Sequence, residues 1–127
     1  MSNKPKQGTF CWNELMTQDV AGAKAFYTGL LGWESQELPM GDGMTYTIFK
    51  TADQDVAGML QTPAGQEDMI PPHWLSYIAV DDIDSMTNKA ESLGATIKVP
   101  VQTVEGMGCF SVMMDPTGAH FAFWEAM

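Results

Sequence analysis

A single carboxylate, Glu14, has the setting of a proton-transfer group. It lies in a run from Thr9 to Met16 that alternates well enough for a β-strand. Phe10, Trp12 and Met16 share its face, because residues two apart on a strand point the same way. A carboxylate among apolar side chains is desolvated, which raises its pKa and suits it to proton transfer. The alternative is a carboxylate at a rim, facing water or paired with a lysine.

Aromatic residues and methionines are the second chemical signal, with 11 Met and 4 Trp among 127 residues. A cavity lined by such side chains binds a flat or apolar small molecule through stacking and dispersion. The alternative is that the same side chains fill a core. Strand parity predicts one ligand-binding set facing a central cavity: Trp12, Glu14, Tyr46, Met59, Leu75, Tyr77, Phe110, His120, Ala122 and Trp124.

The elements that must position these residues occur twice. A fixed offset over several landmarks indicates an internal repeat. The landmark pairs, each separated by 62 residues, are Trp12 and Trp74, Asp19 and Asp81, Leu31 and Leu93, and Gly32 and Gly94. We therefore expect two similar half-domains, each opening with a strand and a helix.

In each half, the sequence pattern predicts one strand, one helix and three more strands. The predicted strands span residues 9–16, 33–38, 44–50 and 56–61, then 73–80, 96–102, 108–114 and 119–125. Pro100 indicates that its strand lies at the edge of a sheet or contains a bulge. Turn residues separate the strands, at Pro39–Gly43 and in the type I pattern of Asp115–Gly118.

Helical spacing of apolar residues predicts the two helices. In the first helix Ala23, Phe26, Tyr27, Leu30 and Leu31 form one stripe; in the second the stripe is Ile83, Met86, Ala90 and Leu93. Thr17 or Asp19 caps the first helix, and Asp81 or Asp82 caps the second. Gly32 and Gly94 end them.

This order predicts a single α+β domain made of two βαβββ modules. The first module spans residues 8–62, the second spans 73–127, and residues 63–72, rich in Pro and Gly, link them. One helix covers one face of each four-stranded sheet. The two curled mixed sheets then form a partly closed barrel around a central cavity.

Composition excludes some partners. With 16 acidic and 6 basic residues the net charge is −10, which argues against nucleic acid and anionic membranes. The first eight residues lack the apolar core of a signal peptide, and no apolar run approaches membrane-spanning length. Cys11 and Cys109 lack a Cys-x-x-Cys partner, so we expect reduced thiols and a cytoplasmic protein.

Several of these features together resemble the vicinal oxygen chelate superfamily, which includes glyoxalase I, bleomycin-resistance proteins and extradiol dioxygenases. They are the two-module plan, Phe26-Tyr27 followed by Leu31-Gly32, Val80-Asp81-Asp82 before the second helix, and Asp115-Pro116-x-Gly118 before the last strand. The resemblance covers about residues 8 to 127 and is nearest to the glyoxalase-like or bleomycin-resistance-like branch. It implies the fold more strongly than any one reaction.

The enzymes of that superfamily bind a metal through His, Glu or Gln on the first and last strands of each module. The matching positions here are Trp12, Met59 or Leu60, Trp74 or Leu75, and Ala122. None of these side chains suits a divalent ion that prefers carboxylate or imidazole. We therefore predict no metal cofactor. The alternative is a displaced site built from Glu14, Gln61, His73 and His120, of which a His₂Glu set would suit zinc or iron.

Two functional hypotheses follow. The first is a metal-free protein that binds a small aromatic or apolar molecule, as bleomycin-resistance proteins do. The second is a lyase, isomerase or dioxygenase-type enzyme with a divalent metal at a displaced site, or with Glu14 and His120 as acid and base. In either case we expect a homodimer, because small open sheets leave edges and apolar surface that symmetric pairing covers.

Overall fold

Two compact units make up the chain. The computed structural model describes residues 4–41 and 43–127. The N-terminal unit is Trp12–Trp74, and the C-terminal unit joins the segment that ends at Cys11 to Leu75–Met127. Each unit contains one helix and one four-stranded stretch of sheet, as an α+β domain of two βαβββ modules requires.

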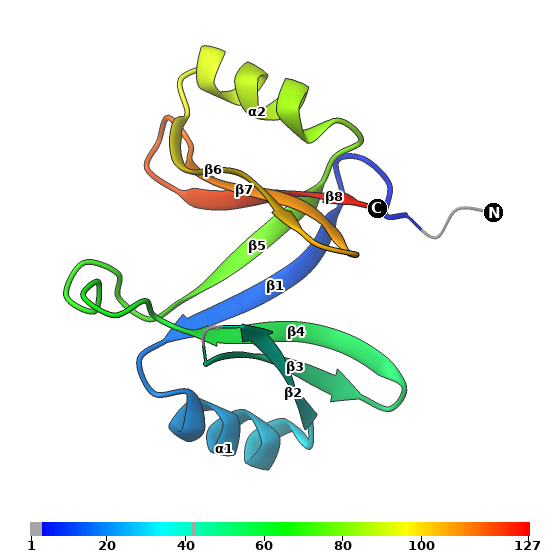
Figure 1. Cartoon of the computed structure of the whole chain (residues 1–127), viewed down its shortest axis with the longest axis vertical. Helices are drawn as coiled ribbons and strands as arrows, with labels where there is room; N and C mark the ends of the chain where they lie inside the picture. Colours follow the sequence, from blue (N-terminus) through cyan, green and yellow to red (C-terminus); the bar gives the residue numbers. More distant parts are fainter. Residues whose placement is uncertain (1–3, 42) are drawn as a thin grey trace. The chain divides into compact units, whose positions relative to one another are not determined.

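The N-terminal unit carries the first helix and four strands. They are β1 (Phe10–Thr17), α1 (Val20–Leu31), β2 (Glu34–Gly41), β3 (Met44–Thr51) and β4 (Gln54–Gln61). The strand order is β2-β3-β4-β1; β1 and β4 pair in parallel and the other pairs are antiparallel. In Figure 1 α1 lies along one face of this sheet, which leaves the opposite face without a helix of its own.

The C-terminal unit repeats this plan. Its elements are β5 (His73–Ala79), α2 (Ile83–Ser92), β6 (Thr96–Val104), β7 (Gly108–Met114) and β8 (His120–Ala126). The order is β5-β8-β7-β6, with β5 and β8 parallel and the rest antiparallel. Figure 1 shows α2 against the face formed by β6, β7 and β8. All eight predicted strands are therefore present, and none of the described helices is long and apolar enough to cross a membrane.

Prolines fall where a missing N–H costs least. Pro39 extends β2 beyond its predicted end, and the pairing shifts register between Pro39 and Gly41. Pro100 lies in β6, where the register shifts between Val99 and Gln102, as predicted for an edge or bulge. Both strands end the strand order of their unit. The predicted turn at Pro39–Gly43 includes Asp42, which lies outside the described residues.

Side-chain caps fix where the helices begin. The Asp19 carboxylate accepts a hydrogen bond from the backbone N–H of Gly22 at 2.8 Å, and Asp82 accepts one from Ser85 at 3.2 Å. Gly32 ends α1 in the left-handed conformation, with φ 71°. Of the alternative caps that the sequence allowed, Asp19 and Asp82 are the ones used.

Each helix packs on one face of its own sheet. In the N-terminal unit the buried core is Leu15, Phe49, Ala57 and Met59, against which Val20, Ala23 and Tyr27 of α1 pack. In the C-terminal unit the core is Val80, Ile83, Met113 and Phe123, with Met86 and Ala90 of α2. One face of each sheet is therefore buried against its helix.

The predicted stripe of α1 is wrong at three positions. Ala23 and Tyr27 pack against the core as expected, but Phe26, Leu30 and Leu31 are 58%, 63% and 51% exposed. For Phe26 the reason is angular, whereas Leu30 and Leu31 lie in the last turn of α1. Phe26 precedes Tyr27 by one residue, which places it about 100° around the helix from the residue that meets the core. The apolar surface of α1 is thus wider than the core that it covers.

Candidate functional site

A chain of two hydrogen bonds joins three side chains on β1 and β3 of the N-terminal unit. The indole Nε1–H of Trp12 donates to the phenol oxygen of Tyr46 at 2.9 Å. The Tyr46 hydroxyl donates in turn to Glu14 Oε2, also at 2.9 Å. Trp12, Glu14 and Tyr46 are all half-buried. Parity on β1 predicted that Trp12 and Glu14 share a face, and the structure brings Tyr46 to both of them.

The direction of these bonds is fixed by chemistry. An indole N–H can only donate, so the Tyr46 oxygen must accept from Trp12, and the Tyr46 hydroxyl donates its single hydrogen bond to Glu14. Burial raises the pKa of Tyr46, and the negative charge of Glu14 raises it further. Tyr46 therefore stays protonated across the physiological range and holds one oxygen of Glu14.

A glycine makes room for this arrangement. Gly58 on β4 is the register partner of Glu14 on β1. A Cβ at Gly58 would lie 1.7 Å from the Tyr46 oxygen and 2.3 Å from its Cζ, so the phenol occupies the space that any side chain would need. Sequence reasoning missed this role. The signal was available, because an isolated glycine inside a strand pattern indicates a close approach of another group.

Met59 does not join this group, so its prediction as a lining residue is wrong. Leu15 and Met59 are register partners, as Glu14 and Gly58 are, and successive strand residues point to opposite faces. Met59 is fully buried in the core with Leu15 and Phe49, on the side covered by α1.

In the C-terminal unit four of the predicted residues form two cross-strand pairs. Phe110 faces Trp124 across β7 and β8, and Tyr77 faces Ala122 across β5 and β8. By parity these residues lie on the face opposite Phe123 and the α2 core. Phe110 and Trp124 are half-buried, whereas Tyr77 is 6% and Ala122 is 0% exposed.

The remaining predicted residues differ in exposure. Leu75 on β5 is buried, and His120 at the start of β8 is exposed and faces Met114 of β7. The Nδ1 atom of His73 is 2.8 Å from the carbonyl oxygen of Pro71, so this ring is held by its own loop.

Two hollows are present in the C-terminal unit. The smaller, about 80 Å³, is bordered by Trp124, Glu125, Val80 and Lys4 among others, and its volume suits a few water molecules at most. The larger, about 310 Å³, runs between α2 and β6 past Thr87. Neither hollow includes Trp12, Glu14 or Tyr46.

A cluster of aromatic rings lies around Tyr27, which the sequence placed only on a helix stripe. Its ring stacks on Trp33 at 6.0 Å and meets Trp74 edge-on at 5.5 Å, between centroids. The indole N–H of Trp74 donates to the Tyr27 hydroxyl at 3.2 Å. Trp74 therefore belongs to the packing around Tyr27, as do Trp33 and Phe49.

The two-module arrangement agrees with a family profile. The profile of the Glyoxalase/Bleomycin resistance protein/Dioxygenase superfamily matches residues 10–123, which is most of the chain. The chain belongs to this superfamily. The resemblance found in the sequence is confirmed, and so is the α+β fold class that it implied.

Among curated members, "Putative glyoxylase CFP32" of Mycobacterium tuberculosis is 37% identical over 122 residues, covering 95% of this chain and 47% of that protein. The anthracycline biosynthesis protein DnrV of Streptomyces peucetius is 31% identical over 129 residues, covering 93% of this chain and 47% of its own. The chain therefore spans about half the length of the curated relatives that it matches.

Solved structures agree on the fold. A hypothetical protein from Bacillus halodurans aligns with a TM-score of 0.69 and 15% identity, covering 96% of both chains. The methylmalonyl-CoA epimerase of Mycobacterium tuberculosis aligns with a TM-score of 0.66 and 16% identity, covering 100% of this chain and 93% of that one. At such low identity these likenesses extend to the fold alone.

The family's metal does not fit the donor set of this superfamily member. Of the positions that match the family's ligands, Met59 points into the core, Ala122 carries only a methyl group, and Trp74 binds Tyr27. Within residues 4–41 and 43–127 no three His, Cys, Asp or Glu side chains come together as a metal site would require.

Proposed function

We propose that this superfamily member is a binding domain without a resident metal, which takes a flat, weakly polar organic molecule on the face of the N-terminal unit opposite α1. The observation that carries the proposal is the Trp12–Tyr46–Glu14 chain of hydrogen bonds. It combines a half-buried indole for stacking with a carboxylate held in place for orientation.

The support is chemical. An ordered carboxylate costs a ligand less to engage than a mobile one, because Tyr46 has already fixed its position. Glu14 accepts from donors, so the ligand should carry a hydroxyl or amine beside its ring system. Two relatives are named anthracycline biosynthesis proteins.

Fluorescence tests this proposal directly. Planar aromatic compounds that carry a hydroxyl should quench the emission of Trp12, and replacement of Trp12 with Phe should remove that change. Tyr46→Phe and Glu14→Gln should weaken binding roughly 5- to 10-fold, the factor expected for one lost hydrogen bond. Trp74→Phe is the matched control, because Trp74 is engaged with Tyr27. Equal affinity in the Glu14→Gln variant would contradict the proposed role of the carboxylate.

The metal-free part of the proposal has its own experiment. Elemental analysis of protein purified without chelator or metal-affinity resin should find no stoichiometric divalent ion. Stoichiometric zinc, nickel, iron or manganese, lost in Glu14→Ala or His120→Ala, would instead establish a displaced site.

Glu14 also favours one second function, proton transfer. Its half-buried carboxylate next to Trp12 has the setting of a general base. Tyr46 is a poor proton donor to a substrate, because burial raises its pKa. If the domain is an enzyme, Glu14→Gln abolishes turnover of a bound compound while binding persists. Turnover that recovers at saturating concentrations of the compound would instead show that Glu14 serves binding alone.

A further inference from the structure

A hollow of about 310 Å³ runs between α2 and β6, the edge strand of the C-terminal unit. Polar residues of the helix border it on one side and apolar residues of the strand on the other: Asp84, Thr87, Asn88, Glu91, Ile97 and Val101. A volume of this size is at the lower end of the range that small-molecule sites occupy. The hollow therefore offers hydrogen-bond acceptors along one wall and hydrocarbon along the other.

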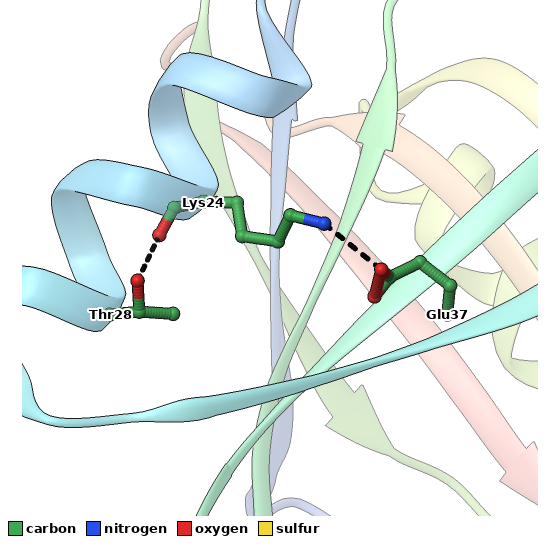
Figure 2. A network of polar contacts seen from close by, with 3 residues as sticks. All are labelled: Lys24, Thr28 and Glu37. Carbon is green, nitrogen blue, oxygen red and sulfur yellow. Dashed lines mark hydrogen bonds and ion pairs between the residues drawn. The ribbon is translucent and has the colours of Figure 1, made fainter.

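The first module bridges the corresponding space with a lysine. Counted from the capping aspartate of each helix, Lys24 of α1 has the same position as Thr87 of α2. Figure 2 shows that Lys24 reaches to β2, where its Nζ lies 2.9 Å from Glu37 Oε1, while its backbone carbonyl accepts from the Thr28 hydroxyl at 2.8 Å. The Thr87 side chain is shorter, and its Oγ1 lies 2.9 Å from Ser111 Oγ on β7. A threonine in place of the lysine thus leaves the space between α2 and β6 unbridged.

The carboxylates of the hollow follow one flank of α2. Asp84, Asn88 and Glu91 are four and three residues apart, which places them on the same side of the helix. At 1.5 Å per residue, Asp84 and Glu91 are separated by about 10.5 Å along the helix axis. The corresponding positions of α1 are Ala21 and Thr28, so the fold itself does not require charge there. The two acids are a property of this helix.

Neither carboxylate is neutralised by the chain. Within residues 4–41 and 43–127 no ion pair includes Asp84 or Glu91, and both residues are exposed. Lys89 comes five residues after Asp84, which turns it about 140° around the helix from that side chain. Lys98 of β6 does not border the hollow. The hollow therefore carries two negative charges that a cationic ligand would meet.

We infer that the hollow binds an aliphatic polyamine, a chain of methylenes that carries protonated amines. Its terminal amines pair with Asp84 and Glu91, because one extended chain reaches both carboxylates. Its methylenes lie on Ile97 and Val101, which removes apolar surface from water. The inference concerns the C-terminal unit and does not depend on the function proposed for the Trp12 group.

The Thr87 hydroxyl supports a ligand that donates hydrogen bonds. Thr87 is 7% exposed, borders the hollow between the two acids in sequence, and is bonded to Ser111. A hydroxyl oxygen has two lone pairs, and this bond uses at most one of them. Thr87 therefore keeps an acceptor, and an amine within the polyamine chain supplies the matching N–H group.

Other cations match the hollow less well. A metal ion binds oxygen ligands at about 2.0–2.6 Å, so it cannot contact two carboxylates that are separated by about 10.5 Å along the helix. No three His, Cys, Asp or Glu side chains of the described chain come together as a metal site. A monoamine would meet one carboxylate and leave the other without a partner. Only a chain with separated charges uses both acids and the apolar wall.

Calorimetric titration of the whole chain with spermidine tests the inference. At about 0.15 M salt the diffuse attraction of a polycation to the acidic chain is screened, and one spermidine should bind per chain. Asp84→Asn and Glu91→Gln should each weaken binding about 3- to 5-fold, the factor expected for one exposed ion pair. Glu105→Gln is the matched control, because it removes the same charge from an exposed position outside the hollow and should leave the affinity unchanged.

A lysine placed inside the hollow provides a second test. Asn88→Lys puts an amine four residues after Asp84 and three before Glu91, within reach of both, and should abolish spermidine binding. Ser85→Lys adds the same charge about 100° around the helix from Asp84 and should retain binding. Asn88 is exposed, so its variant should keep the wild-type circular dichroism. If it does not, the double variant of Asp84→Asn and Glu91→Gln takes its place and should weaken binding at least about 10-fold, since the two effects multiply.

Three results would overturn the inference. The first is no saturable heat from the wild-type chain at millimolar spermidine. The second is a Glu105→Gln variant that loses as much affinity as Asp84→Asn, which would show attraction to net charge alone. The third is a folded Asn88→Lys variant that binds spermidine as tightly as Ser85→Lys does.

Discussion

Replacing Gly58 with alanine is the sharpest test of the Tyr46 site. The added Cβ would lie 1.7 Å from the phenol oxygen of Tyr46, 2.3 Å from Cζ and 2.8 Å from Cε2. Ordinary contact begins at 3.4 Å, so the ring must move away by an amount comparable to a covalent bond. The hydrogen bonds to Trp12 and Glu14 are both 2.9 Å long and cannot follow such a movement.

The expected change in the free energy of unfolding combines two unfavourable terms and one favourable term. Forcing extra volume into a packed site costs about 1–3 kcal/mol. Losing two hydrogen bonds adds about 1 kcal/mol each. Removing a glycine from a strand returns about 0.5–1 kcal/mol, since the unfolded chain loses freedom. We therefore expect Gly58→Ala to lower the free energy of unfolding by roughly 2–4 kcal/mol, a large effect for one methyl group.

Urea denaturation followed by circular dichroism measures this cost, and a double-mutant cycle assigns it. In a Tyr46→Ala background the ring that meets the new methyl is gone, so Gly58→Ala should then cost nearly nothing. In the wild-type background, Gly58→Ala should also abolish binding of any planar aromatic ligand that Trp12 recognises. An equal cost in both backgrounds, or no cost in the wild type, would refute the packing of Tyr46 on Gly58.

Three further predictions concern stability. Met59→Ala should lower the free energy of unfolding by about 2–5 kcal/mol in urea, because Met59 is fully buried. Asp19→Ala should cost about 1 kcal/mol by the same measurement, because Gly22 loses its capping partner. As pH rises above 10.0, the ordinary tyrosine value, the unfolded chain releases the Tyr46 proton while the folded chain keeps it. Wild-type stability should therefore fall more steeply there than that of Tyr46→Phe, as thermal melts against pH would show.

Local rules predicted the elements well. A repeat with landmarks 62 residues apart predicted the two similar modules. Cap chemistry predicted helix starts at Thr17 or Asp19 and at Asp81 or Asp82, of which Asp19 and Asp82 are used. Parity also predicted the shared face of Trp12 and Glu14, which now includes Tyr46. These successes share a cause, because strand and cap geometry depend on residues close in sequence.

Contacts between elements that are far apart in the sequence were harder to predict. Met59 was predicted to line the cavity but lies in the core, because alternation along a strand does not say which face meets the helix and one residue of register reverses the face. Phe26 and Leu30 were predicted on the apolar stripe from their helical spacing, although the core beneath α1 is narrower than the helix's apolar surface. The closure of the sheets into a barrel, the cytoplasmic location and the absence of a metal stay predictions.

In both modules an aromatic ring packs beside a strand glycine, but the polar contacts of the two rings differ. In the N-terminal unit the atoms nearest to a Cβ at Gly58 all belong to Tyr46; in the C-terminal unit a Cβ at Gly108 would meet the backbone oxygen of Glu125 first and then Trp124, 2.8 Å from the indole Cζ2. An aromatic ring therefore lies against a strand glycine in both modules, although at Gly108 the backbone is nearer than the ring. Tyr46 additionally brings a hydroxyl that joins an indole to a carboxylate. Since a ring packs beside a glycine in both modules, the polar chain is the feature that packing alone does not require, and recognition of a ligand's polar group is best sought at Glu14.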